Sequence, residues 1–377
     1  MSEFRVKVIN TINDIDSLLW DEFFDYQIEN RYFYFKTLEE SEKNKVKFYY
    51  ILFYKETRII AIVPLFILSF PIDISVQGYF KKITEMLKKV FPRLLNIKTV
   101  FIGNINNNGG IGIDKNISNI ELLFKKIIVE INKIAKEEKA LLINFKDFSV
   151  KYANIMKKNG FSCIESYPNT KLEIKFKNIE EYLKNLSHAT RYDMRRKIKQ
   201  YSQLPPLNLE IKNNCSCDID LIYELYLNTV KNNDLIFEII SKDFFINLTK
   251  NMPKETFFFI WKLNGKIVSF EVSSIINNTM LAHYIGFDYE ILYKYNLYFI
   301  TFLDRMDWCI KNNIRYLKSG GFGYEPKKRL KFDFERNFFY MKPCNRILEP
   351  FFKLGLLFFK PENQDKDLKF LKKMNKI

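Results

Sequence analysis

Three side chains in the C-terminal half have the chemistry of proton transfer and anion binding. His283 is one of only two histidines among 377 residues, and an imidazole with its ordinary pKa exchanges protons near neutral pH. Glu325 and Lys327 stand two residues apart, where a carboxylate can take a proton and an ammonium can hold an anion. The plainer alternatives are a structural histidine and a loop salt bridge worth less than about 1 kcal/mol. These three residues are therefore our catalytic candidates.

A basic stripe supplies candidates for substrate binding. Arg191, Arg195 and Lys199 recur at four-residue spacing in the helical stretch 179–201, and like charges so placed destabilise a helix by a few tenths of a kcal/mol per pair. Either solvent and salt or an anionic ligand must offset that repulsion. Guanidinium groups commonly bind phosphate or carboxylate through two parallel hydrogen bonds, so we expect this stripe to bind an anionic group of the substrate. Further binding candidates near the catalytic ones are Tyr284, Tyr324 and Lys328, the last replacing Lys327 if its helix starts one position later.

The strands and helices that must position these residues can be predicted between Glu255 and Pro343. Apolar runs on either side of Asn264-Gly265 predict a hairpin, because a type I′ turn needs positive φ at both central residues. Apolar spacing of three and four residues then predicts a helix from Leu297 to about Asn312. The full expected order is strand (256–261), strand (267–276), strand (280–287), helix (297–312), strand (315–318), helix after 323, and a last aromatic strand near 341.

The first half contains a similar unit. Strands are expected at 46–54 and 58–68 around a tight turn, followed by a strand at 99–103, a helix at 120–139 and strands at 140–145 and 171–176. This repetition predicts two superposable halves from a tandem duplication. We place a first domain at 1–176, a second at 177–345 and a basic, apolar tail at 346–377.

Two segments of the second half resemble GNAT-type N-acyltransferases, in particular the double-domain branch that holds CelD/BioF-like and Fem-type transferases. They are His283-Tyr284-Ile285-Gly286-Phe287-Asp288 and the later Tyr324-Glu325-Pro326-Lys327. Leu186-Ser187 followed by Arg191 is similar to the pattern that opens the second domain of that family. The resemblance implies an α/β (α+β) fold of two tandem GNAT-like domains, each with a mixed, mostly antiparallel sheet flanked by helices. It also implies that the second domain is catalytic.

The activity implied is transfer of an acyl or aminoacyl group from a thioester or tRNA donor to an amine of a cell-envelope or small-metabolite acceptor. The glycine-containing pyrophosphate loop of acetyl-CoA users is absent between Asp288 and Leu297. Acyl-CoA, acyl-carrier protein and aminoacyl-tRNA therefore stay open as donor substrates, with no tightly bound cofactor expected. The alternative from another class is a non-catalytic RNA- or tRNA-binding protein that uses the basic helix 183–201.

Composition adds weaker constraints. The net charge is +16 with a pI near 9.3, which attracts an anionic donor, carrier or tRNA, although a solvated Lys-rich surface explains it equally well. Five cysteines without metal-site spacing favour a reducing, cytoplasmic setting, with no metal and no DNA partner expected. No apolar run reaches the roughly 20 residues of a transmembrane helix, which leaves peripheral membrane contact open.

Three further segments carry specific expectations. The loop Asn104 to Gly110 is either a phosphate cradle or, in the reading we favour, an ordinary turn, because no P-loop Lys-Ser/Thr follows it. Residues 232–237 are a candidate lid. Residues 81–90 are expected to form a helix.

Overall fold

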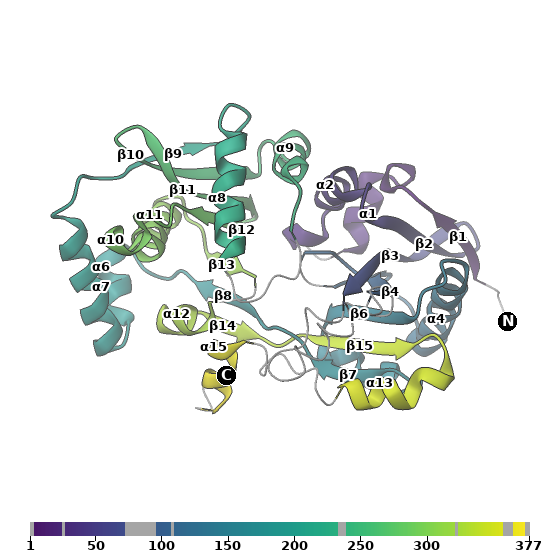
Figure 1. The fold of residues 1–377 in the computed structure, drawn as a ribbon. Coiled ribbons are helices and arrows are strands. Elements are labelled where there is room, and N and C mark those ends of the chain that lie inside the picture. Colours follow the sequence, from purple (N-terminus) through teal and green to yellow (C-terminus); the bar gives the residue numbers. More distant parts are fainter. Residues whose placement is uncertain are drawn as a thin grey trace. The chain divides into compact units, whose positions relative to one another are not determined.

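The structure is a computed structural model that describes residues 4–24, 27–71, 96–106, 109–232, 239–320, 323–356 and 365–373. It divides into two compact units (Figure 1). The first holds Met1–Tyr167 and Arg336–Lys372, and the second holds Pro168–Glu335 and Lys373–Ile377. The helix expected at 81–90 and, apart from Asn232, the expected lid lie outside the described residues.

The first unit is built on a sheet of eight strands over the described residues. Its order is β1-β2-β3-β4-β6-β15-β7, with β5 paired to β3, and β4 and β6 are its parallel neighbours. The strands are β1 (Arg5–Ile9), β2 (Lys47–Lys55), β3 (Arg58–Pro71), β4 (Asn96–Ile102), β5 (Gly112–Ile113), β6 (Leu142–Phe148), β7 (Ser162–Glu165) and β15 (Phe338–Pro343).

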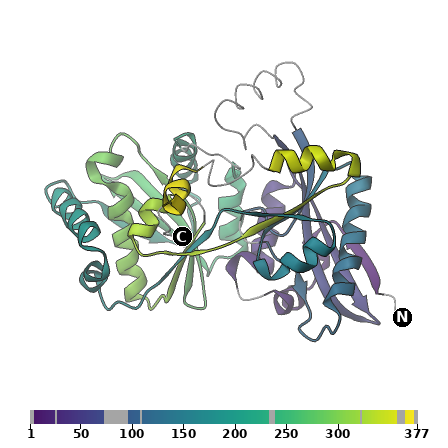
Figure 2. The same ribbon diagram turned by 90° about the horizontal axis from the view of Figure 1, so that it is seen from below.

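Helices cover both faces of this sheet (Figure 2). The apolar stripe of α4, which includes Phe124, Ile127 and Ile131, packs on one face. Trp20 and Phe35 from α1 and α2 belong to a second cluster on the other face. The helices and 3-10 turns are η1 (Ile12–Asp14), α1 (Ser17–Phe23), η2 (Ile28–Asn30), α2 (Tyr32–Glu42), α4 (Ile120–Glu137), η4 (Val150–Tyr152), α5 (Ala153–Lys158), η5 (Arg346–Leu348), α13 (Glu349–Leu356) and α15 (Lys366–Lys373).

The second unit contains a seven-stranded sheet in the order β14-β8-β13-β12-β11-β10-β9. The predicted hairpin is confirmed: Asn264 and Gly265 have φ of 49° and 84° between β10 and β11. The strands are β8 (Asn169–Glu173), β9 (Asn208–Lys212), β10 (Thr256–Leu263), β11 (Lys266–Ile276), β12 (Thr279–Phe287), β13 (Tyr316–Ser319) and β14 (Asp333–Glu335).

The helices of the second unit also lie on both sheet faces. Phe302, Met306 and Cys309 of α11 pack on one face, and Phe245 of α9 packs on Phe270 of β11 on the other. The helices are α6 (Ile179–Asn185), α7 (His188–Tyr201), α8 (Ile219–Lys231), α9 (Lys242–Asn251), α10 (Leu292–Tyr295), α11 (Leu297–Lys311) and α12 (Tyr324–Arg329).

Read from β1 and from β9, the two sheets have the same order of antiparallel and parallel neighbours, so the predicted tandem duplication of one fold is confirmed. One detail recurs in both copies. Asp114 directly follows β5 and Asp288 directly follows β12. Each donates its backbone N–H to a carbonyl of β3 or β11, and each side chain accepts the N–H of the residue two positions later. Arg58 and Lys266, at the hairpins, pair with these two aspartates.

Two strands lie in the sheet opposite to the one expected. The segment near 171–176 was expected to close the first domain, but β8 pairs with β13 and β14 in the second sheet. The aromatic strand near 341 was expected in the second domain, but β15 pairs with β6 and β7 in the first. The boundaries 1–176 and 177–345 are therefore wrong. An alternating pattern identifies a strand but not the sheet that accepts it.

The basic stretch 179–201 is two helices and not one. Leu186 ends α6, and the Ser187 side chain accepts the N–H of Thr190 at the start of α7. A serine that satisfies a free N–H of the first turn is a strong helix start, so the break follows from the sequence. Among the described residues, no helix combines the length and apolar character needed to cross a bilayer.

Candidate functional site

The pairing of β12 with the parallel strand β13 ends before β12 does. Its register runs from Thr279 opposite Tyr316 to Ala282 opposite Ser319, and β12 then continues to Phe287. Beyond Ala282, the described part of β12 is paired with β11 alone. A strand that continues past the end of its neighbour keeps backbone groups for another partner. We call this end of the pair, bounded by β12 residues 283–287 and the end of β13, the wedge.

The backbone of β12 points into the wedge at alternate residues. The N–H of Phe287 is turned away from β11 and donates to Thr229 Oγ1 at 3.1 Å. The Asp288 N–H next to it donates to Val268 O of β11. Because strand N–H groups alternate in direction, the N–H of Ile285 is turned away from β11 like that of Phe287. One backbone donor of the wedge is thereby located.

His283 is a β-bulge residue at the start of the wedge. Ala282 pairs with Ser273 and Tyr284 with Val272, so His283 is the extra residue of β12. Its Nε2 lies 2.8 Å from Ser274 Oγ, and its ring is 6.3 Å from the Phe244 ring. Burial lowers the pKa of His283 to about 3. The expected unperturbed imidazole is therefore wrong, and His283 is neutral at pH 7.

Tyr284 belongs to an aromatic cluster between β12 and two helices. Its ring lies 5.4 Å from Tyr226 and 5.7 Å from Phe244. Gly286 lets α8 lie directly against this strand, since a Cβ there would be 2.7 Å from the backbone carbon of Leu225. These contacts fix the position of β12, and they assign Tyr284 packing in addition to the binding role expected from sequence.

The loop and helix after β13 hold the remaining candidates. Lys327 is buried and its Nζ donates to Gly320 O at 2.6 Å, one residue beyond the Ser319–Ala282 pair. Lys327 and His283 therefore both reach the end of the β12–β13 pair. Glu325 Oε1 lies 3.9 Å from Arg329 Nε, with its side chain 37% exposed.

Two of the predicted binding residues in α12 have structural partners. The hydroxyl of the buried Tyr324 donates to Pro168 O at 3.2 Å, and the Lys328 ammonium lies 5.3 Å from the centre of the Phe334 ring. Tyr324 thus anchors α12 to the start of β8. Of the two candidate lysines, Lys327 is the one that bonds to Gly320 next to the end of β13, whereas Lys328 lies against Phe334.

The basic stripe of α7 is partly neutralised. Arg191 donates to Lys184 O at 2.9 Å, and Arg195 pairs with Glu180. Lys199 is exposed and its ammonium has no partner among the described residues. The repulsion expected along the stripe is therefore offset largely by protein groups, and Lys199 is the cation of the three left for a ligand.

Asp193 connects α7 to α12. Burial raises the pKa of this carboxyl, but hydrogen bonds from Lys197, Arg196 and Arg329 outweigh it and lower the pKa to about 2. The Arg329 contact is 2.7 Å long. Through it the basic helix is tied to the helix that carries Lys327. The sequence analysis did not single out Asp193 for this role.

A buried ion pair, Glu271–Arg305, was also missed. Arg305 of α11 pairs with Glu271 of β11, both side chains are more than nine-tenths buried, and Ser273 Oγ donates to Glu271 Oε1 at 2.8 Å. A signal did exist, because period-two alternation puts Ser269, Glu271 and Ser273 on one face of an otherwise apolar strand. Among the described residues, no three His, Cys, Asp or Glu side chains converge as a metal site requires.

Residues 188–329 match the family model described as an acetyltransferase (GNAT) domain. Residues 188–329 are therefore an acyltransferase domain of the GNAT superfamily. No curated protein matches it significantly. Among solved structures, FemX is similar at 11% identity with a TM-score of 0.56, over 89% of this chain and 96% of that one. A conserved protein of unknown function from Bacteroides thetaiotaomicron VPI-5482 is similar at 14% identity with a TM-score of 0.51, over 91% and 100%. These likenesses show the two-domain fold.

In the first GNAT-like domain, the position of the wedge is filled by the domain's own chain. The pair β4–β6 ends with Ile102 opposite Phe145, and Gly109 then packs so closely that a Cβ would lie 1.7 Å from Lys146 O. Asn104 Nδ2 donates to the Glu29 carbonyl at 2.6 Å. Asn104 and Gly109, in the described part of this loop, are therefore bound within their own domain, which favours the ordinary turn over the phosphate cradle.

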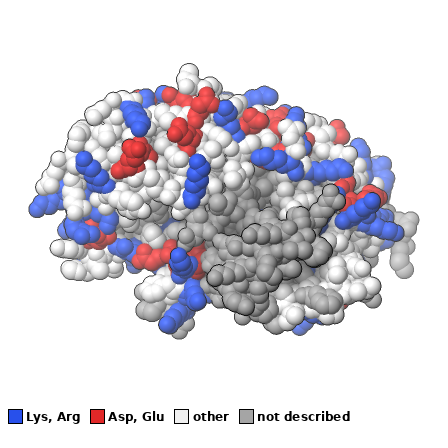
Figure 3. All heavy atoms as spheres, viewed as in Figure 1, with Lys and Arg blue, Asp and Glu red and all other residues white. Residues whose placement is uncertain are grey.

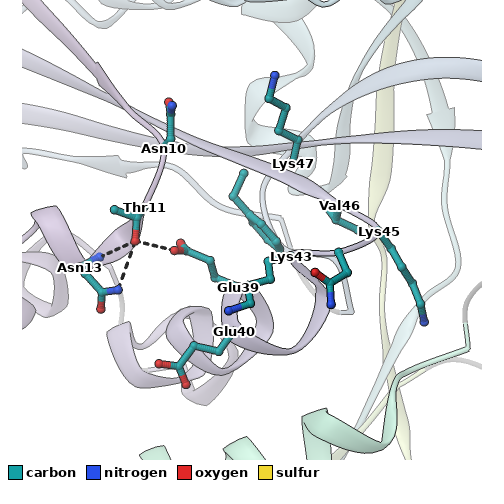
Figure 4. Close-up of a pocket in the computed structure, with 11 residues that line it drawn as sticks. Asn10, Thr11, Asn13, Glu39, Glu40, Lys43, Lys45, Val46 and Lys47 are labelled. Carbon is teal, nitrogen blue, oxygen red and sulfur yellow. Dashed lines mark hydrogen bonds between the residues drawn. The ribbon is translucent and has the colours of Figure 1, made fainter.

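A hollow of about 630 Å³ lies elsewhere in the first domain (Figure 4). Glu39 at its wall accepts from Thr11 Oγ1 (2.6 Å), Ile12 N–H (2.8 Å) and Tyr50 Oη (2.7 Å), so its carboxylate is engaged internally. None of our predicted site residues lines this hollow. Figure 3 shows Lys and Arg interspersed with Asp and Glu over the described part of the face in view, and they do not merge into one continuous basic patch there.

Proposed function

We propose that the second GNAT domain is an N-acyltransferase centre, which moves an acyl or aminoacyl group from a thioester or tRNA donor to an amine of a cell-envelope or small-metabolite acceptor. The observation that carries the proposal is the wedge, where β12 continues five residues beyond its last pair with β13. A carbonyl placed there can accept from the outward-facing N–H of Ile285. Backbone donors that stabilise a developing oxyanion are a principal source of catalysis in acyl transfer.

The reaction needs one bond formed and one broken. The neutral amine nitrogen attacks the donor carbonyl carbon, and the C–S bond of a thioester or the ester C–O bond of a charged tRNA breaks. The proton lost by the amine ends on the leaving group, which departs as the free thiol or the ribose hydroxyl. We assign Lys327 to the charge that develops near Gly320 and Glu325 to proton removal through water. His283, neutral because burial lowers its pKa, accepts or donates only a hydrogen bond near pH 7.

We further propose that α7 binds the anionic part of the donor. Lys199 is the cation available for this role, and the exposed Arg196 lies on the same helix. Beside them, Tyr192 is 69% exposed, which adds an aromatic surface of the kind that stacks on nucleobases. This combination favours aminoacyl-tRNA within the donor set that also contains acyl-CoA and acyl-carrier protein. FemX, which shares the fold, is a relative in structure alone.

The connection from β12 to α11 also bears on the donor. It forms the short helix α10 and reaches α11 through Asn296, whose φ is 51°. This replaces the pyrophosphate loop already missing from the sequence. A cytoplasmic location is part of the proposal and is supported by the five free thiols of the chain.

Turnover of purified protein with each donor class tests the function. Acyl-CoA, acyl-carrier protein and aminoacyl-tRNA are each supplied with diamine and lysine-peptide acceptors, and amide formation is followed by mass spectrometry. Lys327→Met should lower the rate of product formation by about 10²–10³-fold, while Lys254→Met, at an exposed lysine of the same domain, should not lower it. A protein that retains RNA through high-salt washing and forms no amide with any donor would instead be the non-catalytic RNA-binding protein.

A further inference from the structure

The C-terminal segment of the first domain presents an apolar face to solvent. Ile347 is 75% exposed and Leu354 is 57% exposed, on η5 and α13. Leu348, Pro350 and Gly355 beside them are also exposed. Figure 1 shows α13 at the outer edge of its domain. Single exposed apolar side chains are ordinary, but exposed Ile347, Leu348 and Leu354 within eight consecutive residues indicate a surface that another apolar phase covers.

The charge of the sequence around this apolar face indicates which kind of surface it binds. Between Lys342 and Lys360 the sequence carries four cations and one carboxylate, a net charge of +3. The carboxylate, Glu349, pairs with Lys353 at 2.8 Å, and the Lys353 side chain remains 64% exposed. Apolar side chains bordered by cations are typical of segments that lie in the interface of an anionic membrane. The whole chain carries +16, which attracts it to the same surface.

We propose that the face formed by residues 347–355 docks on an anionic phospholipid surface, with Ile347 and Leu354 inserted among the acyl chains and Lys353 at the headgroups. A second copy of the chain would need a complementary acidic face and would not require lipid. The docking is peripheral and does not depend on which donor the second domain uses. It would place the enzyme where lipid-linked or envelope acceptors are found.

Co-sedimentation of the full chain with vesicles tests the proposal. Vesicles of equal parts phosphatidylglycerol and phosphatidylcholine should bind the protein, and vesicles of phosphatidylcholine alone should bind it weakly. Ile347→Asp with Leu354→Asp should weaken binding to anionic vesicles by about tenfold or more, because two inserted side chains are lost. Lys353→Gln should weaken it by about fivefold, and salt should reduce that difference.

The matched control is Leu18→Asp. Leu18 is 76% exposed on α1, which Figure 1 shows at the opposite edge of the same domain, so this variant should bind as the wild type does. All variants should keep the wild-type melting temperature, because the side chains are exposed. The proposal is overturned if wild-type protein ignores anionic vesicles at low salt, or if the double variant binds them unchanged. It is also overturned if light scattering shows that the double substitution converts a lipid-free dimer to monomer.

Discussion

The two domains share one strand order but differ where their parallel strands part. In the first, β4 ends at Ile102, Gly109 packs on Lys146, and β5 then pairs with β3. In the second, the same position holds one bulged residue, His283, and β12 runs on to Phe287. The strand order is the same in both copies, so it does not explain why we propose a donor site in the second domain alone. The proposal rests on the chain at the end of the parallel pair, which differs between the copies.

A second difference lies on the α11 face. Ser273 is opposite Ala282 and Leu65 is opposite Ile102, so Glu271 corresponds to Val63 two residues earlier. Val63 is fully buried among the α4 residues, whereas Glu271 pairs with Arg305. An apolar core suffices for the fold, so the ion pair is an addition of the second domain alone.

The largest effect is expected from breaking that pair. Arg305→Met should lower the free energy of unfolding by about 3–5 kcal/mol, because Glu271 is left as a buried, uncompensated charge. Glu271→Val with Arg305→Met, which makes this site like the first domain, should recover most of the loss. Urea unfolding of the three proteins measures both values. Equal stability of Arg305→Met and wild type would show that the pair is not held in the core.

The next effect concerns catalysis at the wedge. Lys327→Met should lower kcat by about 10²–10³-fold with a smaller change in KM, if the ammonium meets the oxyanion only in the transition state. Steady-state kinetics with the active donor measures both constants, and the melting temperature separates catalysis from folding. Wild-type kcat in the folded variant would remove Lys327 from the site.

A side chain added at Gly286, where α8 lies on β12, should cost stability. Gly286→Val would force side-chain atoms against the Leu225 and Tyr226 backbone, with a loss of about 1–3 kcal/mol from overpacking. Gly355→Val is the control, because no atom lies within 4 Å of its Cβ position. Thermal melts of both variants give the comparison. A Gly286→Val protein as stable as the control would mean that α8 does not lie on β12.

Much of this could be predicted from sequence, and the exceptions have physical causes. The Asn264-Gly265 turn, the α11 helix and the repeat of strand units follow from local backbone preference and periodicity. The exchange of β8 and β15 does not, because Leu172 and Tyr340 give the same alternating pattern in either sheet. The lowered pKa of His283 could not be predicted either, because it depends on burial by Phe244 and other residues distant in sequence.

That burial predicts a pH dependence. The folded pKa of about 3 lies below the unfolded value near 6.5, so the stability from neutral His283 is present above about pH 6.5 and is lost as pH falls toward 3. From pH 7 to pH 5, wild type should lose about 2 kcal/mol more than His283→Gln, in which an amide faces Ser274. Urea unfolding at the two pH values measures this. Parallel losses would mean that His283 is not buried as a neutral ring.

The smallest effect is expected at the basic stripe. Lys199→Gln should raise the KM for an anionic donor by about threefold to fivefold at low salt, the range of one exposed ion pair, and the difference should vanish at high salt. Arg195→Gln should have less effect, since Arg195 pairs with Glu180. KM values measured across a salt series distinguish the two. A KM that does not change with salt in either variant would mean that the stripe is a solvated surface that binds no donor.

Hydrogen exchange of the folded protein with and without donor tests the central claim most directly. Acyl-CoA, acyl-carrier protein and aminoacyl-tRNA are added in turn, and amide exchange is compared at residues 283–287 of β12 and at residues 109–113 of the first domain. The account predicts that the donor that supports turnover slows exchange at 283–287 and leaves 109–113 unchanged. Protection at 109–113 with none at 283–287 would contradict the assignment of the wedge as the donor site.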